Sequence, residues 1–308
     1  MVNTITQFFL LFLTLTFGGG TLLAYPKRGI TTLRRDRVAE DIFVFISELY
    51  AQVTCTVLLT PEGALVIDSM PFPVETREVR AFIDNELGPN SVHYLINTHH
   101  HADHVYGDYL YTEAEVIGHD LCRQTLAQFG EASLARARRQ SPALAEVTLR
   151  LPDITFENEM HVHLGHRHLQ LMHTPGHTSD SISVFEVNER VWVAGDLAMP
   201  VPHIVSGDMQ QFRTSLTKMR HIEPDFVVQG HGDVLLRGEV SEVVDGHLAY
   251  LDAITEQVGA LVAAGASPRK LQDIDIESCG LSRIPLDGAV IKLHMENLIQ
   301  LYKQMAGI

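Results

Sequence analysis

Thr98-His99-His100-His101-Ala102-Asp103-His104 brings four potential metal ligands into six consecutive positions: His99, His101, Asp103 and His104. Imidazole and carboxylate groups are costly to bury unless they are paired or bound to a cation. The stretch directly follows a short apolar run at residues 92–96, which is typical of a buried strand. Ligands just beyond a strand end can converge from a loop. The stretch therefore predicts a metal site.

Three later segments can complete this site. His177 follows a Pro-Gly turn, and Asp196 and His231 each follow a glycine at the end of an apolar run, at 191–194 and 226–229. Glycine lets the backbone turn sharply at such points, and the strands of a sheet can bring distant positions to one rim. The candidate ligands are five histidines and two aspartates: His99, His101, Asp103, His104, His177, Asp196 and His231.

This donor set predicts a pair of metal ions. A single tetrahedral zinc site needs only three protein ligands and a water. Seven ligands fit two ions about 3.5–4 Å apart that share a bridging carboxylate and a bridging hydroxide. Nitrogen and oxygen donors without cysteine fit zinc, and iron and manganese are the alternatives. We therefore expect Zn²⁺ as the cofactor, with two ions per chain.

The ordered motif resembles the metallo-β-lactamase superfamily, over roughly residues 38–261. The Thr98-His99-His100-His101 opening and the aspartate at 196 are similar to its glyoxalase II and lactonase branch. The resemblance implies an α/β fold, a four-layer αββα sandwich with extra C-terminal helices. It also implies how the ions are held: one by His99, His101 and His177, the other by Asp103, His104 and His231, with Asp196 bridging. Asp68, which ends the run 64–67, would brace the histidine loop.

Other histidines lie outside the motif. His161, His163, His166 and His168 surround Leu164-Gly165 in an alternating stretch that predicts a hairpin. Alternation puts His161 and His163 on one face, where we expect solvated side chains, with a surface metal site as the alternative. His203 follows Asp196 closely, and we interpret it as a catalytic substrate contact or proton donor. The alternative for His203 is an ordinary surface-loop residue.

Composition and hydropathy set the domain organisation. Residues 1–30 form a hydrophobic segment, with no charged side chain up to Pro26, and predict a signal, a membrane anchor or an extension. We expect membrane association, if any, through residues 1–26. A catalytic domain is predicted at 36–265, followed at 266–308 by a helical extension packed on it. Residues 239–264 and 286–305 predict amphipathic helices with apolar faces packed on the domain, and a homodimer contact is the alternative. The net charge of −15 disfavours a nucleic-acid surface.

The predicted activity is hydrolysis of a small-molecule ester, thioester or lactone. A bound divalent ion lowers the pKa of its water to about 7, so that a nucleophile is available at neutral pH. Asp103 would orient this nucleophile or shuttle its proton. The alternatives are hydrolysis of a β-lactam, a persulfide dioxygenase with one iron on His99, His177 and Asp196, and a binding scaffold without catalysis. The true β-lactamases of the family usually have Cys or Ser in place of Asp196, which favours the first activity.

Overall fold

The computed structural model describes residues 33–204 and 207–307, which form two compact units. Unit 1 contains residues 41–157 with the short pieces 33–37 and 164–166. Unit 2 contains residues 167–307 with the pieces 38–40 and 158–163. The hydrophobic segment predicted at 1–30, and membrane association through it, lie outside the described residues. Within the described ranges, no helix combines the length and the apolar character needed to cross a membrane.

A seven-stranded sheet is the frame of unit 1, and its strands lie in sequence order. They are β1 (Leu33–Ala39), β2 (Ile42–Ser47), β3 (Thr54–Thr60), β4 (Gly63–Ile67), β5 (Val92–Ile96), β6 (Glu115–His119) and β7 (Ile154–Phe156). The pairs from β2 to β4 are antiparallel, and those from β4 to β7 are parallel. Because β4 and β5 are parallel, with Ile67 beside Ile96, the residues after both strands emerge at one edge of the sheet.

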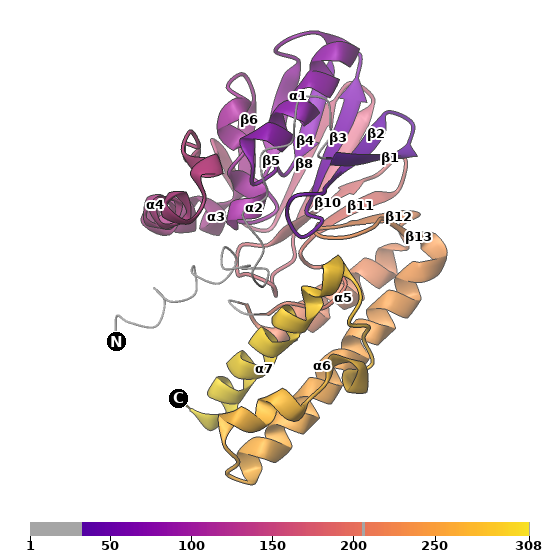
Figure 1. The fold of residues 1–308 in the computed structure, drawn as a ribbon. Helices are drawn as coiled ribbons and strands as arrows, with labels where there is room; N and C mark the ends of the chain where they lie inside the picture. The colour runs from indigo at the N-terminus through magenta and orange to yellow at the C-terminus, as the bar shows by residue number, and fades with distance from the viewer. Residues whose placement is uncertain (1–32, 205–206, 308) are drawn as a thin grey trace. The chain divides into compact units, whose positions relative to one another are not determined.

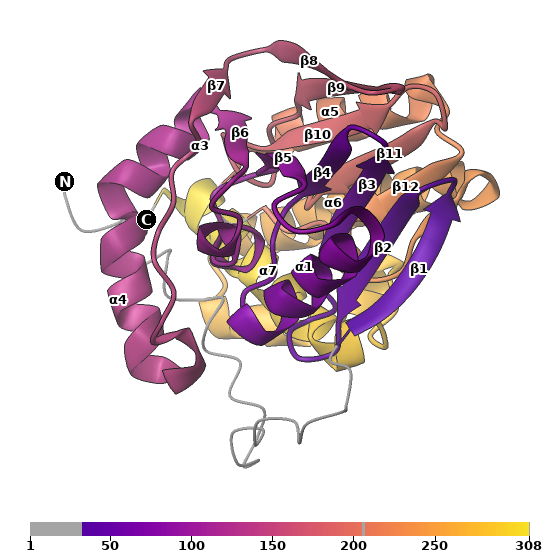
Figure 2. The ribbon, with the colours of Figure 1, turned by 90° about the horizontal axis from the view of Figure 1, so that it is seen from above.

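Helix α1 (Pro73–Leu87) connects β4 to β5 and packs on β4 (Figure 2). It has a proline in its first turn, and Gly88 follows directly after its end, which are common positions for these residues in helices. Its buried Val79 and Ile83 join Val66 and Leu95 in the apolar core of unit 1. The other helical segments of unit 1 are short: α2 (Ala102–Val105), η2 (Asp108–Leu110), α3 (Asp120–Thr125), the π-turn η3 (Leu126–Gly130), α4 (Glu131–Gln140) and η4 (Pro142–Leu144).

Unit 2 is built on a six-stranded sheet in the order β13-β12-β11-β10-β9-β8. Its strands are β8 (Glu159–Leu164), β9 (Arg167–His173), β10 (Ile182–Glu186), β11 (Val191–Gly195), β12 (Phe226–Gln229) and β13 (Leu235–Leu236). Strands β9 to β11 are antiparallel, whereas β11 and β12 are parallel and are connected through α5 (Met209–Ile222). The residues that follow β11 and β12 therefore emerge at a common edge, as they do after β4 and β5 in unit 1.

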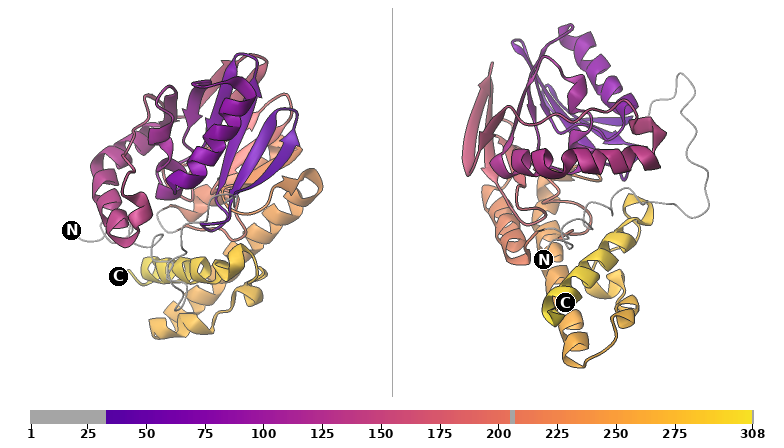
Figure 3. Two further views of the ribbon diagram at one scale, coloured as in Figure 1. Left: turned by 45° about the horizontal axis from the view of Figure 1, so that its top comes forward. Right: turned by 90° about the vertical axis from the view of Figure 1, so that its left-hand side faces the viewer.

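The C-terminal half of unit 2 is helical. It consists of α6 (Arg237–Ala263), η5 (Pro268–Asp273), η6 (Ile276–Cys279), η7 (Leu286–Gly288) and α7 (Val290–Ala306). Helix α7, yellow in Figures 1 and 3, packs against α6, which is orange. Leu251 and Ile254 of α6 and Leu298 of α7 are fully buried, as expected for two amphipathic helices. The predicted boundary at residue 265 falls inside unit 2, and the division into a catalytic domain and an extension stays a prediction.

Candidate metal centre

Unit 1 supplies the histidine loop, residues 98–104, which begins just after β5. Helix α2 starts at Ala102, so that Asp103 and His104 lie in its first turn. The ligand atoms of His99 and His101 lie within 4.8 Å of each other, as do those of Asp103 and His104. All four side chains are buried except His101, which is half-buried. The structure thus brings together the four ligands that the motif predicts in this unit.

Asp68 fixes the histidine loop from the neighbouring strand end. Its Oδ1 accepts a hydrogen bond from the Thr98 amide at 2.7 Å, and its Oδ2 accepts one from the Thr98 hydroxyl at 2.7 Å. The same Oδ2 lies 2.8 Å from Nδ1 of His104. Asp68 adopts a φ of 59°, a conformation that costs energy for a residue with a side chain and recurs at functional sites. These contacts confirm the predicted position of Asp68 under the loop.

The bond to Asp68 decides which nitrogen of His104 faces outward. A carboxylate on Nδ1 favours the tautomer in which Nε2 carries the lone pair that a metal ion requires. His99 is held in the same manner, with its Nδ1 3.0 Å from the Thr98 hydroxyl. In both rings the Nδ1 side is engaged by the protein. The loop is therefore arranged to present Nε2 atoms to a cation.

Unit 2 supplies His177, Asp196 and His231, here called the unit 2 cluster. Nε2 of His177 lies 3.2 Å from Oδ2 of Asp196, and Nε2 of His231 lies 3.6 Å from Oδ1. All three side chains are buried. Two ligands bound tetrahedrally to one zinc ion at about 2.1 Å lie about 3.4 Å apart. One imidazole thus faces each oxygen of Asp196 at the separation of ligands that share an ion, and the donor set fits a bridging carboxylate.

Glycine at position 230 makes this arrangement sterically feasible. A Cβ atom on Gly230 would lie 2.0 Å from Oδ1 of Asp196, well inside van der Waals contact. The Gly230 amide also donates to the carbonyl of Gly195 at 2.9 Å, which ties the ends of β11 and β12 together. The glycine that precedes His231 in sequence is therefore required for the backbone to approach the carboxylate closely.

His203 contributes to the unit 2 cluster through its backbone. Its carbonyl oxygen lies 2.6 Å from Nδ1 of His177, which leaves Nε2 of His177 directed at Asp196. The His203 side chain is 1% exposed, and its Nε2 lies 3.1 Å from Oε2 of Glu296 on α7. The alternative of a surface-loop residue is wrong, because the ring is enclosed between its own segment and α7. The catalytic role of the His203 side chain stays a prediction.

Helix α7 also holds the residues on both sides of His203. Asn297 donates from Nδ2 to the Pro202 carbonyl at 2.5 Å, and its Oδ1 accepts from the Ile204 amide at 3.0 Å. Sequence analysis did not identify Glu296 or Asn297. The signal was present for Asn297, which lies in the helical register of the apolar residues Val290, Leu293 and Leu301 on an amphipathic helix. A buried amide in such a register needs hydrogen-bond partners.

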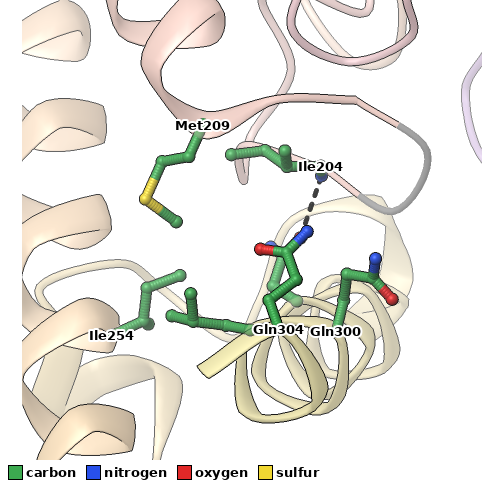
Figure 4. Close-up of a pocket in the computed structure, with 7 residues that line it drawn as sticks. Ile204, Met209, Ile254, Gln300 and Gln304 are labelled. Carbon is green, nitrogen blue, oxygen red and sulfur yellow. Dashed lines mark hydrogen bonds between the residues drawn. The ribbon is translucent and has the colours of Figure 1, made fainter. Parts of the chain in front are cut away.

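A small cavity lies beside this segment in unit 2 (Figure 4). Its volume is about 10 Å³, which is room for about one water molecule. Its lining combines apolar side chains with amides: Ile204, Met209, Ile254, Leu301, Asn297, Gln300 and Gln304. None of these lining residues carries a charge. Ile204 and Asn297, which are joined by a hydrogen bond, both line the cavity.

Sequence comparison identifies the family. A family model described as "Metallo-beta-lactamase superfamily" matches residues 50–231, a range that contains the histidine loop, Asp68 and the unit 2 cluster. The chain belongs to the metallo-beta-lactamase superfamily. The resemblance inferred from the ligand motif is thereby confirmed.

Two curated relatives carry the name "Beta-lactamase-like protein 2 homolog". The protein from Caenorhabditis elegans is 26% identical over 200 residues, which cover 65% of this chain and 62% of the relative. The protein from Drosophila melanogaster is 28% identical over 153 residues, which cover 47% of this chain and 46% of the relative. The chain thus spans less than two thirds of the length of either relative.

Solved structures of the superfamily share the fold. A metallo-beta-lactamase from Pontibacter korlensis matches with a TM-score of 0.57 at 17% identity, covering 69% of this chain and 97% of that chain. One from Hirschia baltica matches with a TM-score of 0.56 at 13% identity. The predicted fold class, α/β with two sheets, their helices and further C-terminal helices as in the metallo-β-lactamase fold, is confirmed.

Proposed function

We propose that this chain is a metal-dependent hydrolase whose active site combines the histidine loop with the unit 2 cluster. Two zinc ions would occupy it, and the superfamily pattern assigns the seven ligands. The first ion would be held by His99, His101 and His177, and the second by Asp103, His104 and His231, with Asp196 bridging. Family membership supports the proposal, because the matched range contains every one of these residues.

The observation that carries the proposal is the orientation of the imidazoles within each unit. His99 and His104 in unit 1 and His177 in unit 2 each have Nδ1 engaged by a protein oxygen, at 3.0, 2.8 and 2.6 Å. This is the pattern of metal-binding histidines, in which an oxygen on one nitrogen fixes the tautomer and the other nitrogen binds the ion. Ordinary core histidines have no reason to share this orientation.

The chain's own residues have separate tasks in the reaction. When bound, divalent ions supply a Lewis acid for a substrate carbonyl and make water nucleophilic at neutral pH. Asp103 accepts the proton of the attacking water and orients it, because its carboxylate lies at the N-terminal turn of α2 within the loop. Asp68 holds the loop in place through Thr98 and His104. The burial of Asp103 and Asp196 excludes bulk water from both carboxylates.

The proposed substrates are esters, thioesters or lactones. In each, a carbonyl carbon accepts the nucleophile, and the bond to the leaving oxygen or sulfur then breaks. An aspartate at position 196 supplies two oxygens that can serve two ions, as the two imidazole contacts of Asp196 indicate. This favours a site with two ions over the single-iron alternative, which would use only three of the seven ligands.

Metal analysis and a substrate panel test the function together. We expect protein expressed without added metal to carry about two zinc ions per chain, and to hydrolyse members of a panel of thioesters, lactones, phosphodiesters and β-lactams. One iron per chain with oxygen consumption would instead establish the dioxygenase. Turnover confined to β-lactams would overturn the proposed substrate class, and bound metal without any turnover would leave a binding scaffold.

A pair of variants tests whether the two clusters share an ion. His104→Ala in unit 1 and His231→Ala in unit 2 should each release the same ion, so the double variant should lose no more metal than either single variant. The exposed His221→Ala at the end of α5 is the matched control and should keep full metal content. Additive losses in the double variant would show that the clusters bind metal separately.

A further inference from the structure

The β8–β9 hairpin carries a second group of imidazoles, remote in sequence from the seven candidate ligands. His161 and His163 are alternate residues of β8 and therefore lie on one face of the strand. His168 comes from β9, and its ring lies against both of them, with centroid separations of 5.0 Å to His161 and 4.3 Å to His163. These three residues are called the hairpin cluster.

The closest pair in the hairpin cluster lies within hydrogen-bond distance. Nδ1 of His161 is 2.8 Å from Nε2 of His168. Two nitrogens bound to one ion at about 2.05 Å lie about 2.9 Å apart at a right angle and about 3.4 Å apart in a tetrahedron. A cation that replaced the proton between the two rings would therefore require only a small displacement of either side chain.

A neighbouring carboxylate sets the correct tautomer of His161. Oε1 of Glu159 lies 3.0 Å from Nε2 of His161 and also accepts a hydrogen bond from Gln170 at 2.9 Å. A carboxylate on Nε2 favours a proton there and leaves the lone pair on Nδ1, the atom that faces His168. A carboxylate behind a ligating histidine is the usual support of a metal site.

The third imidazole can join the first two. The ring of His163 stacks on that of His168 with an interplanar angle of 18°, and its side chain is exposed, so its side-chain torsions have room to rotate toward the pair. The pKa of His168 is lowered, first by the loss of hydration and then by the charges of His163 and His161. His168 thus favours the neutral form, which is the form that binds metal.

We propose that His161, His163 and His168 form a surface site for a divalent transition-metal cation, with Cu²⁺ bound more tightly than Ni²⁺ or Zn²⁺. Copper stands highest in the affinity order of the divalent first-row ions for nitrogen donors. The site would join the two strands at the β8 edge of the unit 2 sheet. It is independent of the proposed hydrolase, because it shares no residue with that site.

Copper titration of zinc-loaded protein tests the site. We expect one Cu²⁺ per chain to bind and to give an electron paramagnetic resonance signal with nitrogen coupling. In a His161→Ala/His168→Ala variant, copper binding should weaken at least about 100-fold, since even outer partners of a metal ligand change affinity 10–100-fold. Zinc content and any hydrolytic activity should stay unchanged in this variant.

His166→Ala is the matched control, because His166 is an exposed histidine in the turn of the same hairpin. It should bind copper like the wild-type chain. Equal copper affinity of the double variant and the wild type would overturn the proposal. A copper resonance signal that disappears in His231→Ala but persists in the double variant would also overturn it. The second outcome would place the copper in the candidate metal centre.

Discussion

At the scale of single residues, the candidate site depends on groups outside the set of seven candidate ligands. Asp68 contacts both the start of the histidine loop and His104, and the carbonyl of His203 contacts His177. The seven candidate ligands were predictable from the sequence, because four of them lie within residues 99–104 and the other three each follow a glycine. The contact of the His203 carbonyl was not, since every residue offers a backbone carbonyl and only the fold selects one.

Asp68→Asn should weaken metal binding by about 10–100-fold, because the amide that replaces one carboxylate oxygen cannot accept both the Thr98 and the His104 hydrogen bonds. Asparagine tolerates the positive φ at this position, so the backbone is preserved. Zinc affinity measured against a competing chelator is the readout. Asp41→Asn is the matched control, because Asp41 also has a positive φ, of 54°, and lies in a turn. Unchanged zinc affinity in Asp68→Asn would rule out the bracing role.

At the scale of elements, strand direction and helix packing place the functional groups. Parallel pairing of β4 with β5 and of β11 with β12 brings Asp68 to the histidine loop and Asp196 to His231. The strands and the amphipathic helices were predictable from hydrophobic periodicity. The contact of α7 with the segment 202–204 was not, because periodicity shows that a helix has a buried face and does not show which segment covers it.

Asn297→Ala should destabilise the chain by about 1–3 kcal/mol, since the Ile204 amide and the Pro202 carbonyl both lose a buried partner. It should also lower zinc affinity, because the neighbouring His203 carbonyl no longer holds His177 firmly. Urea denaturation and chelator competition measure the two effects. Gln304→Ala, an exposed amide on the same helix, should change neither. A loss of stability with full zinc affinity would limit α7 to a purely structural role.

The buried His247 of α6 should make stability depend on pH. Burial lowers its pKa from 6.5 to about 4, so the folded chain keeps the ring neutral while the unfolded chain takes up a proton. The stabilisation is complete above pH 6.5 and is lost as the pH falls from 6.5 toward about 4. Between these two pKa values, the free energy of unfolding changes by up to about 1.4 kcal/mol per pH unit, because one proton is taken up on unfolding.

Denaturation of metal-free protein across this range tests the effect of His247. The decline of unfolding free energy with falling pH should be shallower in His247→Leu, whereas His221→Leu, an exposed replacement on α5, should follow the wild type. Parallel curves for His247→Leu and wild type would exclude His247 as the source of the pH dependence.

At the scale of the whole molecule, the proposed site requires ligands from both units. Removal of metal by a chelator should therefore lower the free energy of unfolding. A ligand present at 1,000 times its dissociation constant stabilises by about 4 kcal/mol if it binds only the folded state. Urea denaturation with and without the chelator measures the change. The His104→Ala/His231→Ala variant should respond less than the wild type, and an equal response would indicate that the stabilising metal is bound elsewhere.

The sequence by itself determined the family and the candidate ligands, because these are chemically distinctive side chains, four of them within six positions. Periodicity likewise determined the strands that lead into them. Only the tertiary structure decided how the ligands are held. Asp68 and His104 are separated by 36 residues, His177 and His203 by 26, and Ile204 and Asn297 by 93. Such contacts follow from strand pairing and helix packing. Because the arrangement of strands and helices minimises the free energy of the entire chain, no local sequence pattern encodes it.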